Sequence, residues 1–377
     1  MKRLNELMTP ACLIDEVKLK ANAARVAEVC EAAGVALRPH VKTLKSIEAA
    51  AIYAPALMPI TVSTLAEANI FAEAGYQDIL YAVGLSPNKL PQVNALLQKA
   101  ITFTVVIDSM AAANQLSQNA AQLSNVLQVA IEIDVDDHRA GVKASDPQLL
   151  DIAQRIEQTD NLRFAGVMAH AGASYQCFDA QSRNQMAQQE SQQVLLAAKT
   201  LADHGLPCTM ISAGSTPTVL AAASHAGLTE LRAGVYATFD LVMAGLGVCA
   251  YTDIALSVLT SIIGHQQEKG WVMIDAGWMA LSRDKGTSGQ PLDCGYGLVC
   301  DAHGNVLDGW YVSQTNQEHG IIEHRDGLPA DPTVFAYGNM LRILPVHACA
   351  TAAQFNHYMV TNDNQTCSDS WQRINGW

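Results

Sequence analysis

An alternation of short apolar runs with helix-like stretches, from residue 10 to about residue 245, constrains the fold of this chain more than any other feature. Runs rich in β-branched and other apolar residues predict strands, and the Ala-, Gln- and Glu-rich stretches between them predict helices. The predicted strands are ACLID (11–15), ALRPH (36–40), ITVST (60–64), DILYAV (78–83), TFTVVID (102–108), LQVAIEID (127–134), FAGVMAH (164–170), CTMISAG (208–214) and LTELRAG (228–234). This order is typical of βα units around a parallel sheet.

The number of these units favours a barrel. About eight strands follow the first one, and a (β/α)8 barrel typically takes about 250 residues. A doubly wound sheet is the main competitor, but no GxGxxG follows the first strand and no GxxxxGK[ST] occurs in the sequence. The two nucleotide-binding fingerprints of doubly wound folds are therefore missing. We predict an α/β fold with a (β/α)8 barrel at residues 10–245.

Near residue 246 the alternation of predicted strands and helices ends. The sequence beyond it predicts strands joined by turns that contain Gly, Asp and Pro. The predicted strand regions are ALSVLTSIIGH (255–265), GWVMIDAG (270–277), DGWYVSQTNQEHG (308–320), TVFAYG (333–338) and LRILPVHACA (341–350). Short strands separated by turns favour antiparallel pairing. We predict a mostly antiparallel β domain at residues 246–377, joined by residues 1–9.

The composition excludes several classes of protein. Of 377 residues, 36 are Asp or Glu and 23 are Lys or Arg, so the formal net charge is −13, and 49% of the residues are hydrophobic. A chain this apolar is not a disordered tail, a collagen-like fibre or a miniprotein stapled by disulfides. Because no Lys and Arg cluster runs along this acidic chain, we expect no nucleic-acid partner.

The N-terminal segment and the cysteines indicate the cellular compartment in which the protein is expected. The start, MKRLNELMTPACLID, lacks the apolar segment of a signal peptide, and no run approaches the roughly 20 apolar residues that cross a bilayer. The nine cysteines are irregularly spaced and form no CxxC, which fits reduced thiols. We therefore expect a cytoplasmic protein with no membrane partner.

A lysine follows the predicted strand at 36–40, in the segment RPHVKTLKS. Barrel enzymes carry their catalytic groups at the carboxyl ends of the strands. Burial disfavours an ammonium ion, so a lysine at such a place can lose its proton and condense with an aldehyde. A surface lysine that opens a helix is the ordinary alternative for Lys42.

Two further sequence patterns have the residue types that bind a phosphate or a metal ion. The turn AGSTPT (213–218) places small residues at a strand end that opens a helix, where backbone N–H groups can bind a phosphate. In a strand, residues i and i+2 point to one face, so the imidazole of His347 and the thiolate of Cys349 can bind one cation together. A single HxC also occurs by chance.

Six motifs follow one another in a fixed order along the chain. They are Thr9-Pro10-Ala11 with Asp15, RPHVKT (38–43), EIDVDDHRAG (132–141), AGSTPT (213–218), RAGVY (232–236) and HAC (347–349). Together they resemble the D-serine dehydratase and D-threonine aldolase family. That resemblance implies a pyridoxal-phosphate enzyme of the alanine racemase fold, in the branch of D-threo-3-hydroxyaspartate and D-serine dehydratases.

The resemblance implies roles for particular residues. Lys42 would be the Schiff-base lysine and would also take the Cα proton of the substrate. His40 and Arg38 would flank the cofactor. The cofactor phosphate would be bound at two strand ends, by Gly214, Ser215, Gly234 and Tyr236.

Further residues would face the cofactor ring and the substrate. Arg139 resembles the family arginine that hydrogen-bonds the ring, at either its nitrogen or its hydroxyl. His170 and Tyr175 are the next cofactor-binding residues, and Tyr175 matches a tyrosine on the substrate side. Met168 stands where the dehydratases of the family often carry a second tyrosine, so the substrate pocket differs here.

The resemblance also implies a divalent metal on His347 and Cys349, whose imidazole and thiolate suit zinc, with manganese or cobalt as alternatives. Glu318 and His319 resemble a family segment near this metal. In homodimers of this fold Arg283 could reach an acidic substrate bound to the partner subunit, and a surface salt bridge is the alternative for this residue. A homodimer and a small D-amino acid substrate are the expected partners.

The expected reaction is removal of water from a D-3-hydroxy amino acid, with release of a 2-oxo acid and ammonia. The main alternative is an aldolase that yields glycine and an aldehyde, but family aldolases resemble His-x-Asp where this chain has His-x-Cys. A racemase needs no metal, and a noncatalytic cofactor-binding protein gives no reason for a metal pair.

Overall fold

The computed structural model describes residues 2–377, which divide into two compact units. The first unit, here called the barrel unit, comprises residues 25–42, 54–234 and 376–377. The second, here called the β unit, comprises residues 2–24, 43–53 and 235–375. The domain limits expected from the sequence, 10–245 and 246–377 with 1–9, stay a prediction. The two compact units are each made of several segments of the chain and so do not test these limits. No helix in residues 2–377 is long and apolar enough to cross a membrane.

The barrel unit is built on a parallel sheet that has eight strands within residues 2–377, in the order β3-β10-β9-β8-β7-β6-β5-β4. The strands are β3 (Ala36–Pro39), β4 (Ile60–Val62), β5 (Asp78–Gly84), β6 (Thr102–Ile107), β7 (Leu127–Ile133), β8 (Leu162–Ala169), β9 (Met210–Ala213) and β10 (Glu230–Ala233). An isolated parallel bridge between His40 and Thr61 links the two edge strands, so the sheet nearly closes into a barrel. The predicted barrel and the positions of these eight strands are confirmed.

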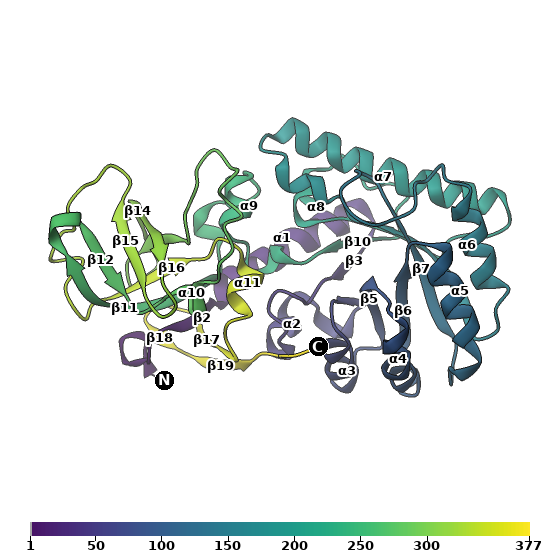
Figure 1. Ribbon diagram of the computed structural model, residues 1–377, viewed down its shortest axis with the longest axis horizontal. Helices are drawn as coiled ribbons and strands as arrows, with labels where there is room; N and C mark the ends of the chain where they lie inside the picture. Colours follow the sequence, from purple (N-terminus) through teal and green to yellow (C-terminus); the bar gives the residue numbers. More distant parts are fainter. Residues whose placement is uncertain (1) are drawn as a thin grey trace. The chain divides into compact units, whose positions relative to one another are not determined.

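Helices alternate with the strands and cover the outside of the barrel (Figure 1). They are α3 (Leu65–Glu73), α4 (Leu90–Leu97), α5 (Met110–Asn119), α6 (Gln148–Glu157), α7 (Ala180–Asp203) and α8 (Thr216–Ala221), while α1 (Glu16–Ala33) runs from one unit into the other and α2 (Ile47–Tyr53) belongs to the β unit. Side chains of Thr64, Ser109 and Asp179 accept N–H groups at the starts of α3, α5 and α7. Such caps satisfy backbone donors that a helix start leaves unpaired.

The interior of the barrel is packed by apolar side chains from successive strands. Leu80, Val106, Ala130, Met168 and Met210 form one buried cluster, with one residue from each of β5 to β9. Filled interiors of this kind are usual in (β/α)8 barrels. Met168 is therefore part of the barrel core.

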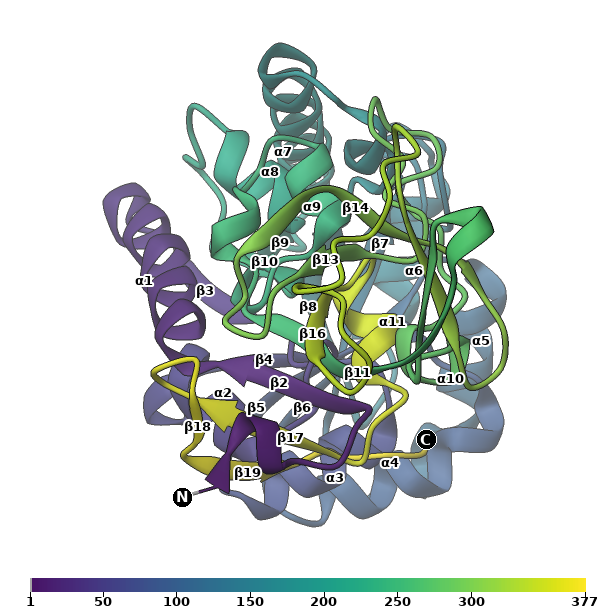
Figure 2. The ribbon, with the colours of Figure 1, turned by 90° about the vertical axis from the view of Figure 1, so that its left-hand side faces the viewer.

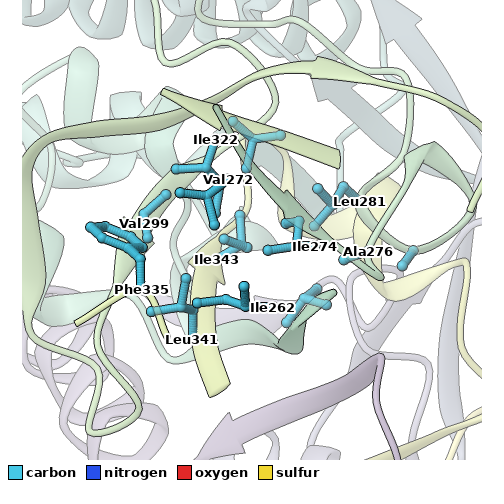
Figure 3. Close-up of a cluster of buried hydrophobic side chains, with 13 residues drawn as sticks. Ile262, Val272, Ile274, Ala276, Leu281, Val299, Ile322, Phe335, Leu341 and Ile343 are labelled. Atoms are coloured by element: carbon cyan, nitrogen blue, oxygen red, sulfur yellow. The ribbon is translucent and has the colours of Figure 1, made fainter. Parts of the chain in front are cut away.

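The β unit contains a mostly antiparallel sheet in the order β12-β15-β14-β13-β16-β11-β2-β17-β19, and a further pairing of β12 with β11 closes six of its strands into a ring. The strands are β2 (Ala11–Asp15), β11 (Leu256–Gln266), β12 (Trp271–Ile274), β13 (Leu298–Cys300), β14 (Val306–Thr315), β15 (Gly320–His324), β16 (Met340–Leu344), β17 (His357–Thr361) and β19 (Asp369–Gln372). Branched and aromatic side chains fill this ring, among them Ile262, Val272, Ile322, Phe335 and Ile343 (Figure 3). The predicted antiparallel domain is confirmed.

The strand ACLID, predicted within the barrel region, belongs instead to this second sheet. As β2 it pairs antiparallel with β11 and parallel with β17, which comes from near the C-terminus. Figure 2 shows β2 near β17, on whose other side β19 pairs. All five residues of β2 are buried, so this run suits a central strand as well as a barrel strand.

Two other predicted strand regions differ. Residues 333–338 form turns, because Oδ1 of Asp331 accepts the N–H and the hydroxyl of Thr333, while Phe335 is inserted into the core. Residues 341–350 contain β16, but the HAC motif follows it at the start of a short helix, α11 (Ala348–Ala352).

Candidate active site

Lys42 follows the end of β3 in the barrel unit. The N–H of His40 donates to the carbonyl of Ala233 at 2.8 Å, which fixes the chain just before Lys42. A Cβ added at Gly234 would lie 3.2 Å from Cβ of His40 and 3.7 Å from Cε of Lys42. The missing side chain of Gly234 thus leaves space beside the partly buried Lys42.

Two histidines share this end of the barrel with Lys42. Burial, followed by the positive charges of Lys42 and Arg232, holds the pKa of His40 well below its usual value. Burial and the charge of Lys42 likewise lower the pKa of His170 to about 3. Because a carbonyl only accepts, Nδ1 of His170 donates to the carbonyl of Gly214 at 3.2 Å. Both imidazoles are therefore neutral near pH 7.

Tyr175 and Arg139 lie in loops that follow barrel strands. Tyr175 belongs to the turn Gly172–Gln176 after β8, and its ring centroid is 6.3 Å from that of His170. Arg139 is exposed in the loop after β7, and its charge contributes to the lowered pKa of His170. Tyr175 therefore lies close to His170, while the cofactor-binding role of both residues stays a prediction.

The turn after β9 contains Gly214 and Ser215, which the sequence places at a predicted phosphate site. Gly214 has a φ of +125°, and a Cβ there would lie 2.6 Å from the carbonyl oxygen of Arg232, so this position requires glycine. The hydroxyl of Ser215 caps α8 by accepting the N–H of Thr218. The hydroxyl of Thr216 is buried and has no partner within residues 2–377. An unpaired buried donor at a helix start fits the phosphate of the implied cofactor.

Glu190, which the sequence analysis missed, and Arg232, which it named only within the RAGVY motif, are buried ionisable residues of this site. The Glu190 carboxylate, 2% exposed on α7, accepts the N–H groups of Ala171 and Gly214 and so joins two strand-end loops. Arg232, 4% exposed, donates to the hydroxyl of Ser212 and the carbonyl of Ala169. Glu190 follows Ala187 and precedes Val194 on the buried face of α7, so helical periodicity was the signal that could have revealed it.

Two expected cofactor neighbours have other partners. Arg38 pairs with Glu230 at 2.8 Å and with Asp78 at 2.7 Å, at the starts of β10 and β5. Its guanidinium therefore belongs to the amino ends of the strands, and its expected place beside the cofactor is wrong. Tyr236 is fully buried in the β unit, where its hydroxyl donates to the carbonyl of Tyr53 at 3.2 Å.

The expected metal pair lies in the β unit. His347 is the residue before α11 and Cys349 is in its first turn, so the expected strand geometry is wrong and a helix start brings the pair together. The His347 ring nevertheless hydrogen-bonds the Cys349 side chain. The hydroxyl of Thr43 lies 3.1 Å from Sγ of Cys349. No cluster of three or more His, Cys, Asp or Glu side chains suited to a metal occurs in residues 2–377.

Asp284 is the carboxylate that the sequence analysis left without a role. Its Oδ2 lies 2.6 Å from Nδ1 of His347. Burial favours the neutral ring, but the hydrogen bonds to Asp284 and Cys349 outweigh it and raise the pKa of His347 to about 11. The same hydrogen bond lowers the pKa of Asp284. Imidazole and thiolate, held together in this way, fit a zinc-type ion with positions left for substrate or water.

The other β-unit residues expected near the metal or the substrate have local partners. His319 hydrogen-bonds Asn316 at 3.0 Å, and Glu318 is exposed. Arg283 is exposed, with its guanidinium 4.6 Å from the ring centre of Trp278.

The lowered pKa of His170 predicts that the protein loses stability in mild acid. The folded pKa is about 3 and the unfolded one about 6.5, so the unfolded chain binds more protons between these values and stability falls as the pH drops below about 6.5. We expect the free energy of unfolding in urea to fall by about 2 kcal/mol at pH 5 because of His170.

His170→Asn keeps a donor for the Gly214 carbonyl but does not titrate, so it should reduce this pH dependence. His204→Asn is the matched control, because His204 also faces a backbone carbonyl through Nδ1 but is exposed. An unchanged pH dependence in His170→Asn would contradict the prediction.

Comparisons with known proteins agree with both units. The family model of the alanine racemase N-terminal domain matches residues 14–241, and a serine dehydratase domain model matches residues 255–361. The D-threo-3-hydroxyaspartate dehydratase of Delftia sp. (strain HT23) is 47% identical over 374 residues, which cover 98% of each chain. The chain belongs to this dehydratase family. Its fold is that of alanine racemase, and its family consists of pyridoxal-phosphate enzymes.

Two further similar proteins are a relative that is more distant in sequence and one whose structure has been solved. The D-serine dehydratase of Dictyostelium discoideum is 29% identical and covers 99% of this chain and 98% of its own. A solved structure of a D-threo-3-hydroxyaspartate dehydratase, a cysteine-to-alanine variant in the metal-free form, has a TM-score of 0.95 at 46% identity and covers both chains completely. The description of that variant implies that its parent protein binds a metal.

Proposed function

We propose that this protein is a lyase that removes water from a D-3-hydroxy amino acid and releases a 2-oxo acid and ammonia. D-threo-3-hydroxyaspartate, named for the Delftia relative, and D-serine, named for the Dictyostelium relative, are the proposed substrates. Lys42 would hold pyridoxal phosphate, and His347 with Cys349 would hold a divalent ion.

The contact between His347 and Cys349 is the observation that favours dehydration over the other reactions. The two side chains hydrogen-bond each other in the β unit, and Asp284 holds the imidazole from its other side. Hydroxide is a poor leaving group, and a divalent ion bound there would act on the substrate hydroxyl as a Lewis acid. A racemase has no use for such a pair, and the aldolases of the family resemble His-x-Asp at this place.

Pyridoxal phosphate, when bound, supplies an electron sink for the electrons of the Cα–H bond. The residues of the barrel unit would position it and handle the proton. Lys42 is the proposed base for the Cα proton, and the neutral rings of His40 and His170 add no positive charge beside it. The remaining proposed cofactor contacts are Arg139, Tyr175, Gly214, Ser215 and Gly234.

Zinc is the proposed ion, because a thiolate with an imidazole suits it best, and manganese or cobalt would be the substitutes. Tyr175 is proposed to act on the substrate side of the cofactor. A cytoplasmic homodimer is the proposed state of the protein in the cell, by analogy with its family.

The proposed reaction is tested with purified protein, pyridoxal phosphate and either D-threo-3-hydroxyaspartate or D-serine, with and without a chelator. We expect ammonia and 2-oxo acid in equal amounts, lost on chelation and restored by zinc. Glycine without ammonia would contradict dehydration and favour the aldolase. Racemised substrate without either product would favour the racemase.

A further inference from the structure

The contact between Asp284 and His347 defines which ring nitrogen a metal can reach. Oδ2 of Asp284 is 2.6 Å from Nδ1 of His347, and an ionised carboxylate only accepts hydrogen bonds. Nδ1 therefore carries a proton toward Asp284, and Nε2 is the nitrogen that an ion can bind by displacing its proton. We infer that Asp284 is a positioning residue that orients His347 for metal binding through Nε2.

Asp284 is itself held at its other oxygen. Oδ1 accepts the N–H of Gly286 at 2.8 Å, and the backbone N–H of Asp284 donates to the hydroxyl of Ser282 at 3.2 Å. With one oxygen bound by the loop and the other by His347, the carboxylate has little freedom to rotate. A carboxylate fixed in this way also fixes the plane of the imidazole.

A second carboxylate fixes the backbone between the two ligands. Asp240, 1% exposed, accepts the N–H of Ala348 through Oδ2 and the N–H of Met243 through Oδ1, both at 3.0 Å. The peptide that joins His347 to Cys349 is thereby tied to the start of helix α9 (Leu241–Gly245). Ring orientation is then the remaining freedom of the pair, and Asp284 restricts it.

The inference rests on the proposed metal site, since it assigns Asp284 a role toward an ion on His347 and Cys349. Two protein ligands bind an ion less tightly than three or four, so their preorientation weighs heavily on affinity. Carboxylates behind histidine ligands typically contribute 10- to 100-fold to metal affinity. The negative charge of Asp284 also favours the positive charge of the ion.

The test measures zinc affinity rather than activity, by competition with a chromophoric chelator on the full-length, cofactor-loaded protein. We expect Asp284→Ala to bind zinc about 10- to 100-fold more weakly than the unchanged protein. Asp284→Asn keeps an oxygen acceptor for Nδ1 but loses the charge, so its affinity should lie between the two.

Asp275 offers a matched control in the same unit. Its carboxylate also accepts several hydrogen bonds, from Thr9, Thr260 and the backbone of Ser261. Asp275→Ala and Asp275→Asn should keep the zinc affinity of the unchanged protein, even where their melting temperatures fall. A loss of zinc affinity specific to Asp284 variants separates positioning from general stability.

Equal zinc affinity in folded Asp284→Ala and in the unchanged protein would overturn the inference and leave the proposed function standing. Absence of zinc binding in the unchanged protein would overturn both. If Asp284→Ala fails to fold, Asp284→Asn decides, because it must bind zinc more weakly than Asp275→Asn for the inference to hold.

Discussion

Replacement of Lys42 by alanine is expected to lower the rate of ammonia release by about a thousandfold or more, because a positioned acid or base typically contributes 10²- to 10⁴-fold. Lys42 is the amine proposed both to hold the cofactor and to take the Cα proton. The expected variant is folded and binds pyridoxal phosphate without the visible absorbance of an imine. Absorbance spectra and ammonia assays at matched protein concentration test the two roles together.

Lys45 provides the control for this experiment. It is a partly buried lysine three residues further along the same segment, and the resemblance assigns it no cofactor contact. Lys45→Ala should keep the imine absorbance and most of the activity. If Lys45→Ala lost the imine and Lys42→Ala kept it, the proposed assignment of the cofactor lysine would be wrong.

Cys349→Ala is expected to remove the bound zinc and to lower the rate of dehydration by about a hundredfold, since Lewis-acid help at a leaving group is worth several kcal/mol. The hydrogen bond to His347 would be lost as well, which frees the ring on that side. Zinc content by elemental analysis and product release under the same conditions measure both effects.

Cys208 is the matched cysteine for this experiment, because it is partly buried in the barrel unit and burial raises the pKa of its thiol to about 11. A thiol of that kind is an ordinary packing residue. Cys208→Ala should retain zinc and activity. Full dehydration by zinc-free Cys349→Ala would contradict a role of the metal in the reaction.

The barrel could be predicted because its signal is local. Each strand of the barrel unit is an apolar run between helical stretches, so the period along the chain alone locates β3 to β10. The placement of β2 is different, since its five buried residues suit any central strand. Only its partners, β11 and β17, decide its sheet, and they lie more than half the chain away.

The residues of the candidate site also differ in whether the local sequence signals them. Lys42 follows a predicted strand and Gly214 ends one, so the rule that barrel chemistry gathers at carboxyl ends of strands was enough to nominate them, whereas His170 was named from the family resemblance. Asp284 is 63 residues from His347 in sequence, and nothing in either segment signals the other. The sequence did not predict that a helix begins at HAC, because three residues of these types fit a strand or a helix start equally well.

The position of β2 has a consequence for synthesis of the chain. This strand ends at residue 15, yet its neighbours β11 and β17 end at residues 266 and 361 and are made later. On the ribosome its largely apolar side chains must therefore wait for β11 until residue 266 has been made, and for β17 until residue 361. Pairings so distant in sequence close slowly and leave an exposed edge open to other chains. The need to shield one short segment during translation is thus built into the topology of the β unit.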